Sequence, residues 1–219
     1  MKKRLLLSLG AFLILFVASC GRGGASIDDP SLTPEEKDDV AYVKRNLEKG
    51  ERLEEYIVAR GAMPVELMAD DFKRYRDEVY KAGLDYNSCK TRGIAQGMEK
   101  AQNKILTIQA EIVSKCSEWQ VSQGTSEYIF VMATVKGPVS KGGKLSKLIA
   151  VFNPVTDQHD FTLPLTTPVV NNASMILSAL NGELFSYATD GTYDKKLLAG
   201  KTTNTVVKFI LEADPSTVR

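Results

Sequence analysis

The spacing of apolar residues changes about halfway along the chain, and this change limits the folds that the chain can adopt. Between residues 33 and 117 apolar side chains recur every three or four positions, which is typical of helices that bury one face. From Glu127 onward, short β-branched and aromatic runs are separated by turn residues, which is typical of antiparallel strands. Helices followed by strands predict an α+β fold, with N-terminal helices packed against a C-terminal antiparallel sheet of about five or six strands. We expect one compact domain that combines a mainly helical region, 33–117, with a β region, 118–219.

The helical region opens with a clear start signal. Thr33 precedes a proline, and Glu36 follows three positions later, which is the spacing of a capping box. Glycines interrupt the apolar pattern after it, and glycine commonly ends helices. The pattern predicts three helices: one from Thr33 to Gly50, a second over residues 51–60, and a third from Pro64 to Gly83.

The first 19 residues have the features of a secretory signal peptide. A basic start at residues 2–4 is followed by an apolar run, 5–17, that is short for a membrane span. The run ends in Val17-Ala18-Ser19-Cys20, which resembles the lipobox of bacterial lipoproteins. The resemblance implies cleavage before Cys20 and attachment of lipid, including palmitate, to the sulfur and the amine of that residue. An ordinary signal peptide, or an uncleaved anchor, is the alternative interpretation.

Residues 20–32 are predicted to form a flexible, lipidated tether. The segment is rich in Gly and Ser and contains little that could pack. A flexible chain of this length spans roughly 20 Å, which lets a folded domain clear the lipid head groups. The residue after Cys20 is Gly21 and not Asp, and resemblance to enterobacterial sorting then implies the outer membrane. We expect the folded part to face the periplasm or the cell surface.

Residues 88–117 suit two structures that exclude one another. Cys89 and Cys116 bracket the segment, and two leftover thiols in an exported protein usually pair. A continuous helix from Ile94 to Cys116 would hold its ends roughly 33 Å apart, whereas bridged cysteines need α-carbons within about 7 Å. Because β-branched residues weaken the helix, we expect the disulfide, with a short helix followed by a strand. An unbroken helix is the alternative, favoured by a heptad seam of Ile94, Met98, Ala101, Ile105, Ile108 and Ile112.

The β region contains five or six candidate strands. Strands are predicted over 128–135, 144–152 and 159–165 from their β-branched and aromatic residues. Residues 171–180 suit either a helix or a strand, because the Asn181-Gly182 pair that follows can end either element. Further strands are predicted over 183–189 and 203–211.

Charge and motifs exclude several functions. The chain has 28 Lys and Arg against 27 Asp and Glu, and removal of residues 1–19 leaves 25 against 27, so no excess of positive charge indicates nucleic-acid binding. The single histidine, His159, is accompanied by neither a Gly-x-Ser-x-Gly motif nor a second histidine for a zinc site. We therefore predict no catalytic residue, no metal ligand and no cofactor.

Three functional hypotheses remain after these exclusions. The first is a non-enzymatic interaction or assembly accessory with a protein partner in the cell envelope, held to the membrane through Cys20. The second is a module that binds a small ligand or lipid in a cavity between helices and sheet. The third is a hydrolase of unfamiliar type, which the absence of motifs disfavours.

Cys20→Ala should abolish incorporation of labelled palmitate, because the lipid is expected on that residue alone. The variant should accumulate as precursor or as soluble protein, which fractionation and gel mobility would reveal. Unchanged palmitate labelling would contradict the lipoprotein interpretation.

Overall fold

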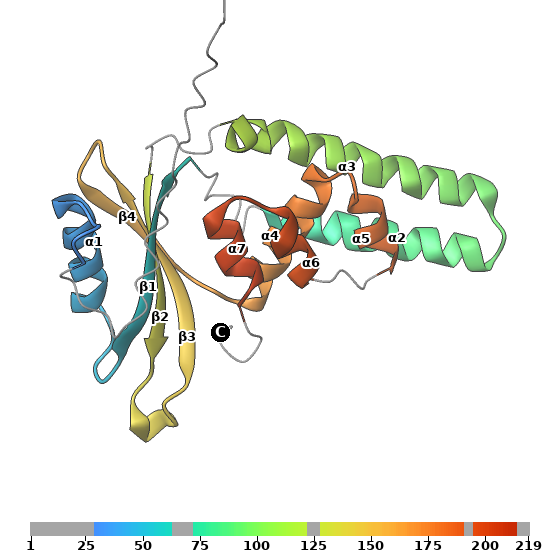
Figure 1. The fold of residues 1–219 in the computed structure, drawn as a ribbon. Helices are drawn as coiled ribbons and strands as arrows, with labels where there is room; N and C mark the ends of the chain where they lie inside the picture. The colour runs from blue at the N-terminus through green and yellow to red at the C-terminus, as the bar shows by residue number, and fades with distance from the viewer. Residues whose placement is uncertain (1–28, 63–71, 122–127, 191–194, 214–219) are drawn as a thin grey trace, which may run out of the picture.

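A four-stranded antiparallel sheet organises the fold (Figure 1). The structure is a computed structural model that describes residues 29–62, 72–121, 128–190 and 195–213, and the side chains of α3 as far as residue 116. The strands follow one another across the sheet in chain order: β1 (Arg52–Gly61), β2 (Tyr128–Lys136), β3 (Leu145–Asn153) and β4 (Gln158–Pro164). The α+β class is confirmed. The expectation of five or six strands is wrong, because the described residues form four.

Both faces of the sheet are covered. On one face lies α1 (Pro34–Arg45), with Val40 and Val43 packed against Val131 and other sheet residues. The capping box is present, since the backbone nitrogen of Glu36 donates to Thr33 Oγ1 at 3.2 Å and the backbone nitrogen of Thr33 donates to Glu36 Oε2 at 2.8 Å. The side chains of β2 that point to the other face pack against the remaining helices.

Four helices of the C-terminal part lie on the side of that second face: α4 (Thr167–Leu180), α5 (Leu184–Asp190), α6 (Lys195–Lys201) and α7 (Thr205–Leu211). Of these, α7 contacts β2, whereas α5 packs against α2, α3 and α4. α4 is buried along most of its length. A short 3-10 turn, η3 (Val139–Lys141), connects β2 to β3. The C-terminal region is therefore mixed and not a continuous β region.

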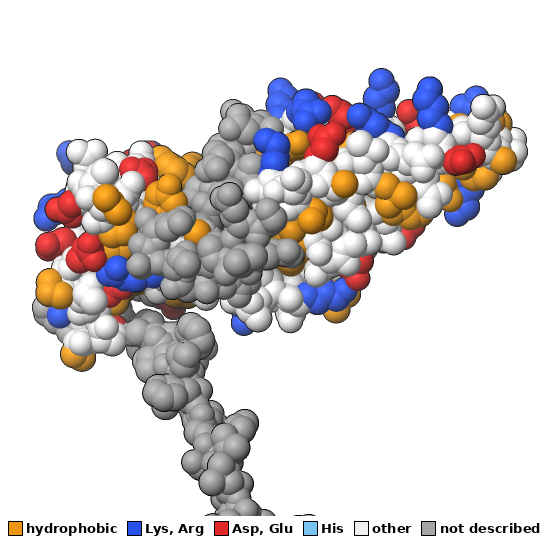
Figure 2. All heavy atoms as spheres, turned by 90° about the horizontal axis from the view of Figure 1, so that it is seen from above, with side chains coloured by type: hydrophobic (Ala, Val, Ile, Leu, Met, Phe, Trp, Pro, Cys, Tyr) orange, Lys and Arg blue, Asp and Glu red, His pale blue; other side chains and the backbone are white. Residues whose placement is uncertain are grey.

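A helical hairpin projects from the body (Figure 1). It consists of α2 (Lys73–Thr91) and α3 (Ala95–Val121), and α3 with 27 residues is about 40 Å long. Four residues of the predicted heptad seam are buried along α3: Ala101, Ile105, Ile108 and Ile112. Figure 2 shows Lys and Arg side chains gathered along one edge of this projecting part.

The hairpin contradicts the expected disulfide. Residues 95–121 form one unbroken helix, and Cys89 and Cys116 are not bridged to each other. Cys89 lies near the end of α2 and Cys116 about 30 Å along α3 from the connecting turn. The expected short helix and strand are therefore wrong. The segment is helical because burial of its apolar seam outweighs the weak helix propensity of its β-branched residues.

The second predicted helix, over 51–60, is wrong as well, because these residues form β1. Ile57 and Ala59 pack toward the helices on one face, whereas Tyr56 and Val58 pack toward α1 on the other. A strand that is covered on both faces carries a continuous apolar run and lacks the alternation of a half-exposed strand. Its sequence is then hard to distinguish from that of a short helix.

Two predicted strands, over 183–189 and 203–211, are in fact α5 and α7. The Asn204 side chain caps α7 by accepting from the backbone nitrogens of Val206 and Val207, both at 3.1 Å. Five of the seven residues of α7 are buried, so its β-branched and aromatic residues report burial and not strand geometry. Residues 171–180, for which both structures were open, are helical within α4.

The third predicted helix corresponds to α2, although its expected start at Pro64 lies outside the described residues. Phe72, Tyr75 and Val79 are buried as expected. The helix does not end at Gly83 but continues to Thr91. A β-carbon at Gly83 would overlap the backbone oxygen of Ala188, so the glycine allows α5 to lie directly against α2.

Gly83→Ala should lower the free energy of unfolding by about 1–3 kcal/mol, because a backbone oxygen cannot move aside as the end of a side chain can. Gly200→Ala in α6 is the matched control. A β-carbon there meets nothing within 4 Å, so the higher helix propensity of alanine should stabilise the protein by up to about 1 kcal/mol. Urea denaturation measures both changes, and equal stability of the two variants would contradict the close contact of α2 and α5.

Candidate functional site

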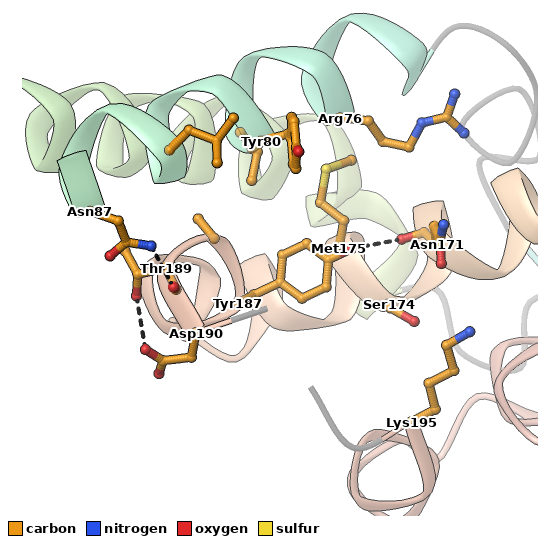
Figure 3. Close-up of a pocket in the computed structure, with 13 residues that line it drawn as sticks. Arg76, Tyr80, Asn87, Asn171, Ser174, Met175, Tyr187, Thr189, Asp190 and Lys195 are labelled. Atoms are coloured by element: carbon orange, nitrogen blue, oxygen red, sulfur yellow. Dashed lines mark hydrogen bonds between the residues drawn. The ribbon is translucent and has the colours of Figure 1, made fainter. Parts of the chain in front are cut away.

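A groove lies between α2, α4 and α5, next to the start of α6 (Figure 3). Its volume is about 470 Å³. Sites for small molecules and peptide side chains usually have volumes of roughly 300–1,000 Å³. The groove is therefore large enough for a small molecule or for a few side chains of a peptide.

One face of α2 forms the rim of the groove. Arg76, Tyr80, Leu84 and Asn87 follow one another at steps of four, four and three residues, so they lie along one side of the helix. Tyr80 is 68% exposed and Leu84 is 52% exposed. Single exposed apolar residues are ordinary on protein surfaces, but adjacent ones that border a groove often mark an interaction site.

The floor of the groove belongs to the core of the protein. Val79 and Met175 line it and are almost fully buried. Tyr187 of α5 reaches across to α4, where its hydroxyl donates to the backbone oxygen of Asn171 at 3.4 Å. Burial raises the pKa of Tyr187, although nearby Arg76 opposes this shift, so the phenol stays neutral at physiological pH.

Hydrogen bonds from α2 close the groove at both ends. Asn87 Nδ2 donates to the backbone oxygen of Thr189, in α5, at 2.8 Å. Arg76 Nη1 donates to the backbone oxygen of Pro168, in α4, at 3.2 Å. Together with the contact at Gly83, these bonds hold three helices at a fixed spacing, so the groove exists before anything binds.

Backbone oxygens accept most of the hydrogen bonds that hydroxyl groups in the groove donate. Three of its hydroxyl groups donate to a backbone oxygen: Ser174 to Val170 at 2.9 Å, Thr189 to Phe185 at 3.0 Å, and Tyr187 as described. A serine or threonine nucleophile needs a neighbouring base that accepts this proton. The one carboxylate contact among these three hydroxyls is that of Thr189, whose Oγ1 also donates to Oδ1 of the neighbouring Asp190 at 3.3 Å, in an exposed position.

The residues singled out from the sequence do not meet in this groove. Cys20 lies outside the described residues. Cys89 is half-buried against Gly97 of α3, and Cys116 is buried in the core. Among the residues that the structure describes, no group of three His, Cys, Asp or Glu side chains is arranged to hold a metal ion.

His159 takes part in an aromatic cluster and not in a polar site. Its ring stacks on Tyr42 of α1 with 4.7 Å between centroids and meets the edge of Phe152 at 5.2 Å. Nδ1 lies 3.3 Å from the Tyr42 hydroxyl, and Nε2 lies 2.8 Å from Thr162 Oγ1. These contacts help to attach α1 to the sheet.

Near this cluster, one carboxyl group has an unusual environment. Asp39 of α1 is only 8% exposed, and its Oδ2 has no hydrogen-bond partner in the described part of the chain. Burial, followed by the negative charges of Glu35 and Asp157, raises the pKa of Asp39 to about 7. Arg60 opposes the shift only in part, since it is engaged by Glu35 and Glu36 at 2.8 Å each.

No family model matches the chain, and neither a curated protein nor a solved structure matches it. Within the described ranges, no helix is long and apolar enough to cross a membrane. Inference about function therefore starts from the residues of this chain and their geometry.

Stability should fall as the pH rises from about 4 to above 7. The folded state holds a proton on Asp39 up to about pH 7, whereas the unfolded chain loses it near 3.8, so deprotonation in this window favours unfolding. At about 1.4 kcal/mol per pKa unit, the loss is roughly 2–4 kcal/mol. Asp39→Asn should remove this loss and be the more stable protein at pH 8, as urea denaturation at several pH values would show. Parallel pH profiles of the two proteins would exclude a special role for Asp39.

Proposed function

We propose that this chain is a lipid-anchored protein of the cell envelope that binds a protein partner through the groove between α2, α4 and α5. Cys20 would carry the lipid, at the outer membrane, and the folded part would face the periplasm or the cell surface. Its role is that of a non-enzymatic interaction or assembly accessory. The hydroxyls of Ser174, Thr189 and Tyr187 in the groove all donate to backbone oxygens, which supports this role.

The exposed pair Tyr80 and Leu84 carries the proposal. Full burial of a large apolar side chain contributes roughly 1.5–3 kcal/mol, and these two side chains are 68% and 52% exposed. A partner that covers both would therefore gain roughly 2–4 kcal/mol from them alone. An enclosed small ligand would leave much of this surface in water, so the rim favours a protein partner.

The groove lies on the side of the sheet opposite to the helix that follows the membrane anchor, so anchoring leaves the groove open to a partner. α1 is the first helix after the tether, and it covers the face of the sheet opposite to the groove (Figure 1). The tether adds a span of roughly 20 Å. Attachment through Cys20 therefore holds the protein at the membrane while the groove faces away from α1.

A small apolar ligand is the second candidate. The volume of about 470 Å³ and the apolar floor at Val79 and Met175 favour it. Such a ligand would depend on the floor and much less on the exposed rim. Substitutions of the rim therefore distinguish the two functions.

In the double variant Tyr80→Asp/Leu84→Asp, two charges lie on the docking surface. The amount of partner protein crosslinked to this chain in intact cells should therefore fall at least about tenfold. Leu106→Asp is the matched control, because Leu106 is an exposed apolar residue of α3 outside the groove. All the substituted side chains are largely exposed, so the stability of both variants should stay within about 0.5 kcal/mol of the wild type. Equal recovery of crosslinked protein from the two variants would contradict docking at the groove.

A further inference from the structure

Two cations at the groove have no carboxylate partner. Arg76 and Lys195 form no ion pair with any residue that the structure describes, whereas Arg74 of α2 is paired with Glu78 at 2.9 Å and Lys201 of α6 with Glu183 at 2.7 Å. The cations that face the groove are thus available to a ligand. An anionic group of the partner would complement them.

Arg76 is also held in a fixed position. One of its five N–H groups donates to the backbone oxygen of Pro168, and this bond orients the guanidinium at the end of the groove. A planar guanidinium matches the two oxygens of a carboxylate, so a carboxylate is the anion that this group binds with the best geometry.

The groove has a direction. Arg76 and Lys195 lie at the same end as Asn171, whereas Asp190 lies at the opposite end next to Asn87 and Thr189 (Figure 3). The exposed rim residues Tyr80 and Leu84 follow Arg76 along α2 away from the positive end. A ligand with its acid at the positive end and its apolar groups beyond it matches this order.

The spacing of the rim matches an extended peptide. Arg76, Tyr80 and Leu84 are four residues apart, which is about 6 Å at 1.5 Å per residue. In an extended strand, residues i and i+2 point to the same side and are about 6.7 Å apart.

We infer that the partner inserts an extended segment of the pattern acidic, any, bulky apolar, any, bulky apolar. Its acidic side chain binds the guanidinium of Arg76, and the charge of Lys195 on the opposite wall of the same end adds to the attraction. Its two apolar side chains cover Tyr80 and Leu84. This inference rests on the proposed protein-docking function and adds the chemistry of the partner to it.

A displayed library of seven-residue peptides, each followed by a carrier protein so that no free carboxyl terminus is present, tests the pattern. The bait is the full lipidated protein in detergent. Asp or Glu should be enriched two positions before a pair of bulky apolar residues that are themselves two positions apart. The double variant Arg76→Glu/Lys195→Glu should select Lys or Arg at that position instead, and should bind the peptides selected by the wild type at least about tenfold more weakly.

Two further variants separate the effect of charge from the effect of folding. Lys195→Glu alone should weaken the acidic preference without removing any hydrogen bond that Arg76 makes. Lys81→Glu reverses an exposed charge of α2 outside the groove, so the acidic preference should be unchanged.

The possible results distinguish failure of the inferred peptide pattern from failure of the proposed docking function. Groove-dependent peptides that disappear with Tyr80→Asp but show no acidic preference, or the same preference in the wild type and in both Lys195 variants, would overturn the inferred pattern and leave docking intact. If no peptide is enriched over a bare support and the crosslinks are also insensitive to the rim, docking at the groove is itself wrong.

Discussion

The buried cluster around α4 is the structural element on which the rest of the molecule depends. Phe130 and Met132 of the sheet, Ile108 of α3 and Val207 of α7 all belong to one core with Met175 of α4. Two serines within α4 direct their hydroxyls to backbone oxygens four residues earlier, at 2.9 and 2.7 Å, so burial of the helix leaves these donors satisfied. Sheet, hairpin and C-terminal helices are thereby joined through a single helix.

The groove inherits its rigidity from this core. Its floor is made of core residues, and its walls are helices whose separation is set by close backbone contact at Gly83 and by the bonds of Asn87 and Arg76. A preformed groove binds with less loss of conformational entropy than one that must be ordered by its ligand. The surface that is left exposed, around Tyr80 and Leu84, is therefore held ready for contact.

Local signals in the sequence predicted the parts of the fold that depend on local structure. The capping box at Thr33, the strands β2 to β4 and the buried seam of α3 are all present. β1 and α7 were misassigned because side chains of β1 pack on both faces of the sheet and α7 is buried on most sides, which removes the periodicity that distinguishes helix from strand. The groove could not be predicted, since it combines residues from position 76 to position 195. The one available signal was the spacing of Tyr80 and Leu84 on a face of α2 away from its buried side.

The hairpin also has a consequence for the order in which the sheet assembles. Gly61 of β1 pairs with Tyr128 of β2, so 67 positions separate two neighbouring strands, whereas Lys136 of β2 pairs with Leu145 of β3 only nine positions later. Closing the longer loop costs about 2 kcal/mol more in chain entropy. In an antiparallel pair of helices, the start of the first helix lies near the end of the second. Once α2 and α3 have paired, they therefore bring β1 close to β2. The edge strand thus depends on the hairpin for its partner, although the two share few contacts.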